Sequence, residues 1–339
     1  MKPEMYIWGF PRWKHPVVRQ CFPGHRLRFV SREALIPNGA TLAVWGMDDG
    51  PLHRPDLHIV RMEDGFLRSV GLGADLVRPM SWVADKSGIY YDASCCSDLE
   101  RILSHHEFDT CLLARAASLR ARVVAGGLTK YNVAGQEWQR PANADQVILI
   151  PGQVESDASL VWGAPGERTN MGLLKRVRQH HPDAYIVYKP HPDVLAGLRL
   201  QGRNEHEAAQ WCDEVVSNVS MAGLFDQVDE VHVLTSLAGF EALLRDKRVV
   251  CHGLPFYAGW GLTRDEIPHA RRKRRLSLDE LVAGALILYP LYLSRDGKLL
   301  ITPEQALDDL LAWRQQKGDQ EPWWRDLFRM VLRRVAGVR

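Results

Sequence analysis

The sequence lacks any run of roughly 20 consecutive apolar residues, which is the length that a helix needs to span a membrane. Residues 1–6 also lack the apolar core of a secretory signal peptide. The six cysteines show no Cys-x-x-Cys spacing, and two of them, Cys95 and Cys96, are adjacent. This usage argues against a disulfide framework and against a zinc site. These absences predict a reduced, cytoplasmic protein.

The sequence also has no large excess of positive or negative charge, since its formal net charge is only +2 at pH 7. This balance does not favour nucleic acid as a partner. The residues are 46% hydrophobic and 25% charged, as in soluble globular proteins. The length of 339 residues is enough for two domains of ordinary size.

Three common nucleotide and metal signatures are missing. Gly71-Leu72-Gly73 lacks the third glycine of the dinucleotide fingerprint, and no Walker motif is present. No Asp-x-Asp follows a predicted strand; Asp48-Asp49-Gly50 comes nearest and is more typical of a turn. We therefore expect neither a Rossmann dehydrogenase nor a metal-dependent sugar transferase, and we predict no bound metal and no cofactor.

The order of apolar segments predicts an α/β protein with two Rossmann-like domains. Strands are predicted at 5–10, 27–30, 40–45 and 57–60, and helices at 16–21 and 99–118. The polar stretch 136–145 is the predicted linker. A second series follows at 146–150, 171–181, 184–187 and 231–234, with later helices starting at Ser277 and Pro303. We predict domains at 1–140 and 146–300 that face a cleft, followed by C-terminal helices at 303–339.

Two strand ends in the second half carry groups suited to phosphate. Lys189 and His191 follow the strand at 184–187, and flanking prolines restrict the backbone there. Thr235 and Ser236 begin a helix whose free N–H groups favour anions. Because open α/β sheets bind ligands beyond the carboxyl ends of their strands, these junctions favour a nucleotide site. A strand-capping turn and an ordinary capped helix are the simpler alternatives.

Carboxylates follow one predicted strand in each half. Glu63 and Asp64 come after the strand at 57–60, where one could act as a general base while the other makes a structural hydrogen bond or caps a turn. Glu155 and Asp157 follow the strand at 146–150, and Asp157 is also a candidate helix N-cap. Two carboxylates that flank a sugar centre can act as base and nucleophile.

These motifs carry a family resemblance. Glu63-Asp64-Gly65, His191-Pro192 and Thr235-Ser236 occur in the order of the motifs of bacterial sialyltransferases and related Kdo transferases. Longer runs resemble the capsule polysaccharide β-Kdo transferases of the KpsC family, at 63–73, 88–93, 129–132, 151–154 and 256–261. The resemblance covers residues 6–292, one module's length, and residues 8–14 look more like the second KpsC module than the first. The chain is thus similar to a single-module homologue or to half of a two-module protein.

The resemblance implies a GT-B-like glycosyltransferase that moves Kdo from CMP-β-Kdo with retention of configuration and without a metal. It implies that the N-terminal domain faces a Kdo-terminated, lipid-linked acceptor and that the domain at 146–300 binds the CMP-sugar. Gln153 would orient the donor. The groups that would hold the CMP phosphate are Lys189, His191, Thr235 and Ser236.

Catalytic roles are implied by the same resemblance. Glu63 would activate the acceptor hydroxyl, with Asp64 as the alternative. Asp157 would be the nucleophile of a double displacement, with Glu155 as the alternative. Two cations are candidates either for binding the Kdo carboxylate or for surface ion pairs, namely Arg68 and Lys130. An inverting CMP-sugar transferase of the sialyl type and a non-catalytic glycolipid-binding module are the competing interpretations.

Residues 322–335 show the pattern of a basic amphipathic helix, with Trp324 and Phe328 on one face and Arg325 and Arg329 beside it. Such helices bind the interface of anionic membranes. We therefore expect a peripheral protein on the cytoplasmic face of the inner membrane; packing across the domain interface is the alternative. The basic residues 271–275 could add a phospholipid patch or form a solvated charge run.

Overall fold

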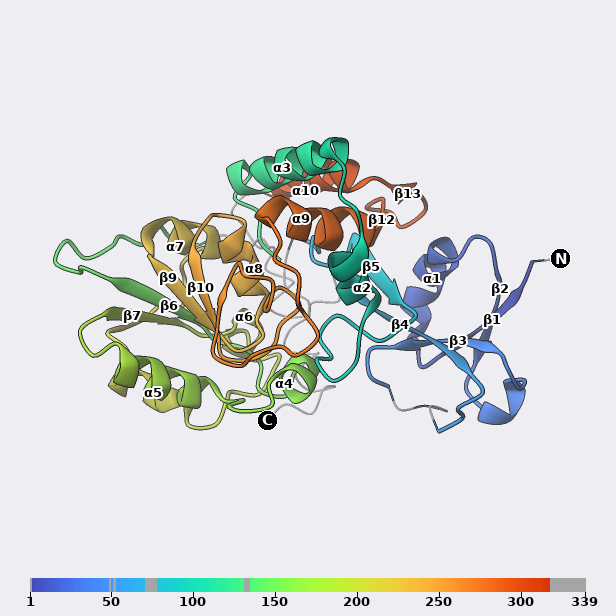
Figure 1. Cartoon of the computed structure of the whole chain (residues 1–339), viewed down its shortest axis with the longest axis horizontal. Helices are drawn as coiled ribbons and strands as arrows, with labels where there is room; N and C mark the ends of the chain where they lie inside the picture. The colour runs from blue at the N-terminus through green and yellow to red at the C-terminus, as the bar shows by residue number, and fades with distance from the viewer. Residues whose placement is uncertain (1, 49, 51–52, 71–77, 131–134, 318–339) are drawn as a thin grey trace.

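The computed structural model describes residues 2–48, 50, 53–70, 78–130 and 135–317, and it contains two β-sheets (Figure 1). The first sheet has seven strands in the order β13-β12-β5-β4-β3-β1-β2, and the second has six in the order β11-β10-β9-β6-β7-β8. Helices pack on both sheets, and the predicted α/β class is confirmed.

The first sheet is built mainly from the N-terminal strands. β1 (Glu4–Trp8) pairs in parallel with β2 (Arg26–Val30) and β3 (Thr41–Trp45), and β3 pairs in parallel with β4 (His58–Asp64). β5 (Ser81–Asp85) is antiparallel to β4, and α1 (His15–Cys21) buries its apolar side chains against the sheet. The strands predicted at these places are confirmed.

The strand predicted at 57–60 is longer than expected. β4 continues through Asp64, so Glu63 and Asp64 lie within the strand rather than in a turn that follows it. The interpretation of Asp64 as a turn cap is therefore wrong. Because successive residues of a strand point to opposite faces, their two carboxylates have different surroundings.

The single helix predicted at 99–118 is also incorrect, because the segment forms two helices. α2 (Asp98–His105) begins after Ser97, whose side chain accepts a hydrogen bond from the backbone N–H of Glu100. α3 (Thr110–Ala125) begins after Asp109, which caps it in the same way. An N-cap residue has an extended backbone, so the second cap forces the chain to leave one helix before it enters the next.

All described strand pairs of the second sheet are parallel. Its strands are β6 (Val147–Pro151), β7 (Tyr185–Lys189), β8 (Glu214–Val215), β9 (Glu230–Val233), β10 (Arg248–Cys251) and β11 (Arg264–Asp265). β6 and β9 are buried along their whole length, as central strands between two helical layers must be. The helices are α4 (Ala158–Gly163), α5 (Asn170–His180), α6 (Pro192–Leu195), α7 (Met221–Gln227) and α8 (Leu237–Leu243). The predicted strand–helix series is confirmed.

After the second sheet the chain returns to the first. α9 (Leu278–Val282) begins at Ser277, the predicted N-cap, and continues as a π-helical segment, Ala283–Leu288. β12 (Leu291–Leu293) then pairs with β5, and β13 (Leu300–Ile301) pairs with β12, before α10 (Pro303–Lys317). The range 146–300 predicted for the second domain therefore includes a strand of the first sheet. The domain boundaries stay a proposal.

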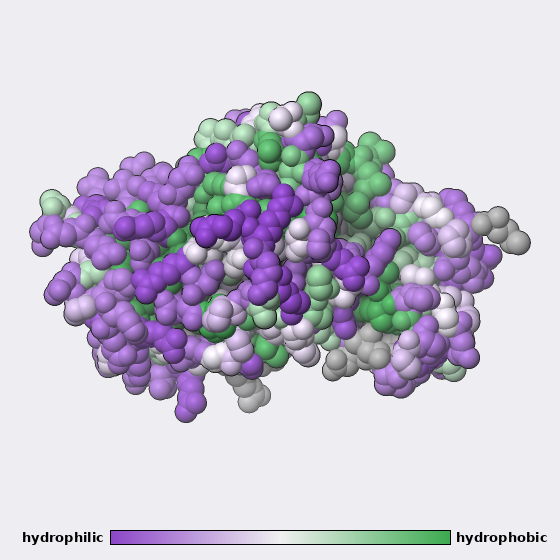
Figure 2. Space-filling view, in the orientation of Figure 1, coloured by the Kyte–Doolittle hydropathy of each residue, from purple (hydrophilic) through white to green (hydrophobic). Residues whose placement is uncertain are grey.

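The two halves share a hydrophobic core. α3 packs on α9, and the ring of Phe66 stacks on the ring of Phe256 with centroids 4.4 Å apart. The face shown in Figure 2 is mostly hydrophilic, and its apolar residues gather near the middle, over α3 and β12. Among the described residues, no helix has the length and apolar character needed to cross a membrane. The helix predicted at 322–335 lies outside the described residues.

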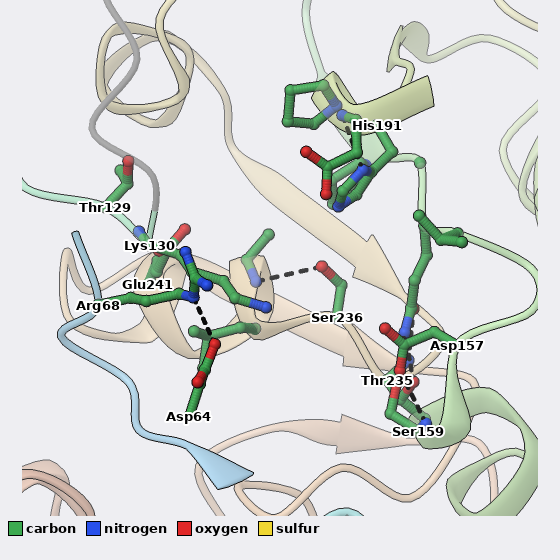
Figure 3. Close-up of a pocket in the computed structure, with 18 of the residues that line it drawn as sticks. Asp64, Arg68, Thr129, Lys130, Asp157, Ser159, His191, Thr235, Ser236 and Glu241 are labelled. Carbon is green, nitrogen blue, oxygen red and sulfur yellow. Dashed lines mark hydrogen bonds and ion pairs between the residues drawn. The ribbon is translucent and has the colours of Figure 1, made fainter. Parts of the chain in front are cut away.

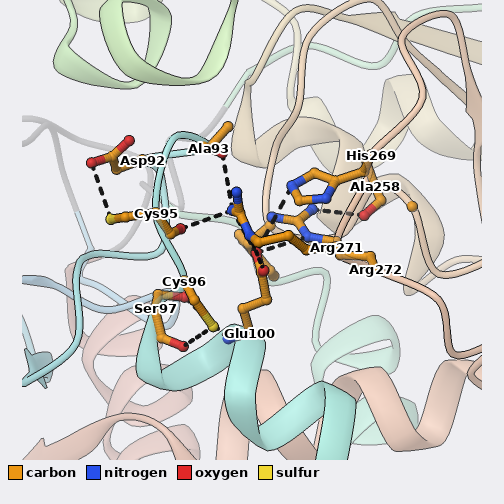
Figure 4. Close-up of polar contacts among 12 residues, drawn as sticks. Asp92, Ala93, Cys95, Cys96, Ser97, Glu100, Ala258, His269, Arg271 and Arg272 are labelled. Atoms are coloured by element: carbon orange, nitrogen blue, oxygen red, sulfur yellow. Dashed lines mark hydrogen bonds and ion pairs between the residues drawn. The ribbon is translucent and has the colours of Figure 1, made fainter.

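A buried polar network joins α2 to the second half of the chain (Figure 4). The carboxylate of Glu100 accepts hydrogen bonds from Arg271 at 2.7 Å and from Arg272 at 3.2 Å. Arg272 is 7% exposed and also donates to the carbonyls of Pro255 and Ala258. The expectation that 271–275 form a lipid patch or a solvated run is therefore wrong for Arg272.

Candidate functional site

A cavity of about 640 Å³ lies between the two sheets (Figure 3). The carboxyl ends of β3 and β4 and the turn Arg12–Lys14 border it on one side, and the carboxyl ends of β6, β7 and β9 border it on the other. The residues predicted from the sequence all line it: Glu63, Asp64, Arg68, Lys130, Gln153, Asp157, Lys189, His191, Thr235 and Ser236. The fold thus brings together side chains that are up to 173 positions apart, from Glu63 to Ser236.

His191 precedes α6 and lies in the cavity wall (Figure 3). Its Nδ1 accepts a hydrogen bond from the backbone N–H of Asp193 at 3.1 Å, so a neutral ring carries its proton on Nε2. Burial, together with the positive charge of Lys130, lowers the pKa of His191 to about 3. The imidazole is therefore neutral at physiological pH. It can donate a hydrogen bond from Nε2.

Lys189 ends β7 beside His191. It is 8% exposed, its Nζ donates to the carbonyl of Ser217 at 3.3 Å, and burial lowers its pKa to about 8. The backbone N–H of Gly152 donates to the carbonyl of Lys189 at 2.7 Å. A Cβ atom at Gly152 would lie 2.6 Å from the hydroxyl of Tyr188, so only glycine permits this close approach of the β6 and β7 ends.

Gln153 organises hydroxyl groups at the starts of α4 and α8. Its Nε2 donates to Thr235 Oγ1 and to Ser159 Oγ, each at 2.8 Å. Thr235 donates in turn to Ser159 at 3.2 Å. Ser236 is the N-cap of α8 and accepts from the N–H of Ala238 at 3.3 Å. The Thr235 hydroxyl is therefore held inside a side-chain network, and Ser236 is the hydroxyl that marks the helix N-terminus.

Asp157 and Glu155, the two candidate nucleophiles, are in different places. Asp157 lines the cavity and also caps α4, accepting from the N–H of Ser159 at 2.8 Å. Glu155 accepts from the backbone N–H groups of Asn170 and Arg203, each at 2.8 Å, and it is not among the residues that line the cavity. The geometry therefore favours Asp157.

Glu63 and Asp64 also differ. Asp64 Oδ2 forms an ion pair with Nε of Arg68 at 2.6 Å, and the Arg68 side chain is buried, so the expectation of a surface ion pair for Arg68 is wrong. Within the described part of the chain, Glu63 makes no ion pair, and its Oε1 accepts from the N–H of Asp64 at 3.0 Å. Burial, reinforced by the charge of Asp64, raises the pKa of Glu63 to about 7. A carboxylate with such a pKa suits general-base chemistry.

Sequence reasoning missed several cavity residues. Glu241 of α8 accepts from the backbone N–H of Lys130 at 2.5 Å, and burial raises its pKa to about 7. Glu241 is the only charged residue of an otherwise apolar helix, and this signal could have identified it. Trp13, Lys14 and Trp45 line the wall next to Glu63. The signal for Trp13 and Lys14 was the aromatic and basic run at residues 8–14.

A cluster with metal-binding side chains lies away from the residues that line the cavity. His181, Glu230 and His232 each have a possible ligand atom within 4.8 Å of the others. In this cluster His232 Nε2 lies 2.6 Å from Glu230 Oε1, and His232 Nδ1 lies 3.0 Å from His252 Nε2. A chain of hydrogen bonds between these side chains accounts for both contacts. The absence of a metal from the reaction stays a prediction.

Two α/β sheets that face each other across a polar cavity define a GT-B-like protein. The model of the capsule polysaccharide biosynthesis protein family matches residues 52–124 and 110–294, and the chain belongs to this family. Two solved structures from Thermosulfurimonas dismutans agree in fold. KpsC β-Kdo 2,7 transferase is 40% identical with a TM-score of 0.77, covering 91% of this chain and 99% of that one. KpsC β-Kdo 2,4 transferase is 30% identical with a TM-score of 0.78, covering 91% and 98%.

Curated relatives from two other bacteria match the chain as well. The capsule polysaccharide modification protein LipA of Neisseria meningitidis serogroup B is 39% identical over 346 residues, which are 99% of this chain and 49% of that protein. The lipopolysaccharide-processing protein LpsZ of Rhizobium meliloti is 39% identical over 310 residues, 86% of this chain and 70% of that protein. The chain thus spans about half the length of LipA. The resemblance to the KpsC family and the GT-B-like fold are confirmed.

Proposed function

We propose that this protein is a retaining β-Kdo transferase that moves Kdo from CMP-β-Kdo to a Kdo-terminated, lipid-linked acceptor in capsule polysaccharide synthesis. One observation carries the proposal: Glu63 and Asp157 lie on opposite walls of a single cavity that also contains Lys189 and His191. The similarity to two KpsC β-Kdo transferases supports the sugar.

The second-sheet wall suits the CMP-sugar. The Lys189 ammonium supplies positive charge, and His191 Nε2–H and the Ser236 hydroxyl supply hydrogen-bond donors for a phosphate. Gln153 holds Thr235 in place and thereby shapes the donor pocket. With this set of groups, the negative charge of the departing CMP is stabilised by protein groups, and we propose that the reaction needs no metal.

Two displacements account for retention. The carboxylate of Asp157 attacks the anomeric carbon of Kdo, the bond from that carbon to the CMP phosphate oxygen breaks, and CMP leaves with the bonding electrons. The carboxylate of Glu63 then takes the proton of the acceptor hydroxyl, whose oxygen attacks the same carbon and releases Asp157. Each step inverts the anomeric centre, so the two steps together retain its configuration.

The decisive experiment is transfer by the purified protein from CMP-Kdo, generated in situ, to a synthetic lipid-like acceptor that carries a short Kdo chain. We expect a β-linked product by NMR, and the same spectra distinguish a 2,4 from a 2,7 linkage. Intact-protein mass spectrometry without acceptor should show a Kdo adduct that is absent from Asp157→Asn. Glu155→Gln is the matched control and should retain the adduct, because its carboxylate lies outside the cavity lining.

Other outcomes would favour the competing functions. An α-linked product without an adduct would indicate an inverting transferase of the sialyl type, in which Asp157 has no covalent role. Binding of CMP or glycolipid without turnover would indicate a non-catalytic module.

Because the chain spans about half of LipA, we propose a second transferase module as its partner. We also propose that the protein acts at the cytoplasmic face of the inner membrane.

A further inference from the structure

Lys14 is a buried cation in the cavity wall that the mechanism above does not use. It ends the short 3₁₀ turn Arg12–Lys14 that follows β1, and it is 7% exposed. Its Nζ lies over the ring of Trp45 and 5.2 Å from the ring centroid of Trp13. Within the described part of the chain, the ammonium group of Lys14 makes no hydrogen bond and no ion pair, and its polar partners there are aromatic ring faces.

An ammonium group in this position lacks hydrogen-bond acceptors of its own. Ring faces attract a cation, but they do not replace the oxygen atoms that water would offer to its three N–H groups. The nearest acidic neighbours do not fill this role, because Asp64 is paired with Arg68 and Glu63 is beyond ion-pair distance. An anionic ligand in the cavity would supply the missing acceptor.

The position of Lys14 in the cavity indicates which anionic ligand it would bind. β1, β3 and β4 are neighbours in the first sheet, and Trp45 is paired in register with Met62, which precedes Glu63. Lys14 is therefore on the wall of the proposed base, whereas Lys189 and His191 lie on the opposite wall. A ligand that contacts both Lys14 and Glu63 is the acceptor, since the base must reach the acceptor hydroxyl.

We propose that Lys14, flanked by Trp13 and Trp45, binds the carboxylate of the acceptor's terminal sugar and thereby selects an acidic sugar as the acceptor. Trp13 is 37% exposed, so it can present a flat apolar surface to a sugar ring while the ammonium, held over the Trp45 ring, pairs with the carboxylate of that sugar. This assignment rests on the proposed function, because that function makes the first-sheet wall the acceptor side.

A simpler role for Lys14 would be to tune Glu63 by its charge. The two roles differ in their dependence on the ligand. A charge that only tunes the base affects the reaction of every acceptor equally, whereas a carboxylate-binding group affects only acceptors that carry the carboxylate. Esterification of the acceptor carboxylate, which removes its charge, therefore distinguishes the two roles.

The test measures binding of a short Kdo glycoside and of its methyl ester to the wild-type protein and to Lys14→Met, by saturation-transfer NMR and calorimetry. The methionine side chain keeps much of the apolar stem. We expect esterification to weaken binding to the wild-type protein by roughly 10- to 100-fold, as for loss of a charge-assisted hydrogen bond. Lys14→Met should weaken binding of the acid by a similar factor and binding of the ester hardly at all. Lys14→Arg should keep part of the preference.

Lys175→Met is the matched control, because Lys175 also lies over a tryptophan ring, that of Trp211, but does not line the cavity. It should bind both glycosides as the wild-type protein does. Equal weakening of acid and ester by Lys14→Met, or a wild-type protein that binds both alike, would overturn the proposal. Adduct formation from CMP-Kdo is measured in parallel on the wild-type protein. Failure of the wild-type protein to form the adduct would count against the retaining mechanism through Asp157, while the binding comparison would still decide the role of Lys14.

Discussion

The carboxylate of Asp64 lies 2.6 Å from Nε of Arg68, and this ion pair separates the roles of two adjacent acids. Asp64 is paired with a buried cation and stays ionised, and burial together with the charge of Asp64 raises the pKa of Glu63 to about 7. Glu63 is therefore the carboxylate that can change its protonation state near physiological pH, as a general base must.

We predict that Glu63→Gln lowers kcat for transfer by on the order of 10²- to 10⁴-fold, the usual contribution of a general base, with CMP binding retained. In the wild-type protein, kcat/KM should rise with pH through about 7 and fall above about 8, because Glu63 is active when it is deprotonated and Lys189 binds the donor phosphate when it is protonated. A pH profile of initial rates tests both statements. Normal activity in Glu63→Gln would move the role to Asp64 or elsewhere.

His191→Ala should weaken CMP binding by roughly 10- to 100-fold, since it removes a buried donor to a charged phosphate. Transfer should be nearly abolished. Because burial keeps His191 neutral down to a pKa of about 3, CMP affinity should show no step between pH 5 and 8 that belongs to this residue. Calorimetric titration with CMP measures both effects, with the exposed His206→Ala as control. Unchanged turnover in His191→Ala would reject the donor-site assignment.

Arg272→Met should destabilise the fold by about 3–5 kcal/mol, because it leaves the carboxylate of Glu100 buried with one cation fewer. The adjacent Lys273→Met is the control; that side chain is exposed, and the change should stay within about 0.5 kcal/mol. Urea unfolding followed by circular dichroism gives both values. Equal stability of the two variants would show that the network around Glu100 does not hold the halves together.

Deletion of the residues after Asp319 should reduce binding to liposomes that contain anionic lipids more than it reduces activity on a soluble acceptor. The reason is that a basic amphipathic helix binds the membrane interface through apolar contact and charge. Cosedimentation with vesicles and a transfer assay on the same preparation provide the comparison. A parallel loss of both would favour a structural tail.

Much of the fold follows from local sequence. The apolar run Val147–Pro151 is short, continuous and followed by glycine, and a segment of this kind can be stable only as a central strand covered on both faces. Ser277 was predicted as a helix N-cap, and the structure confirms it in a capping box with Glu280, which involves only neighbouring residues. The gathering of ligand-binding groups beyond the strand ends followed from the parallel sheet itself.

Other features depend on segments distant in the sequence. The return of residues 291–293 to the first sheet, through pairing with β5, has no local signal, because any short apolar segment could cover that edge. Arg272 looked like one residue of a charged run until Glu100, 172 positions away, proved to be its partner.

The sequence by itself determined the α/β class, most of the strands and the set of polar residues at their ends, because these follow from apolar periodicity and local capping. Only the tertiary structure decided that Asp157 rather than Glu155 lines the cavity, and that Asp64 rather than Glu63 is paired with a cation. It also decided that Lys14 lines the same cavity. The physical reason is that the direction, burial and partners of a side chain depend on packing between segments far apart in the chain.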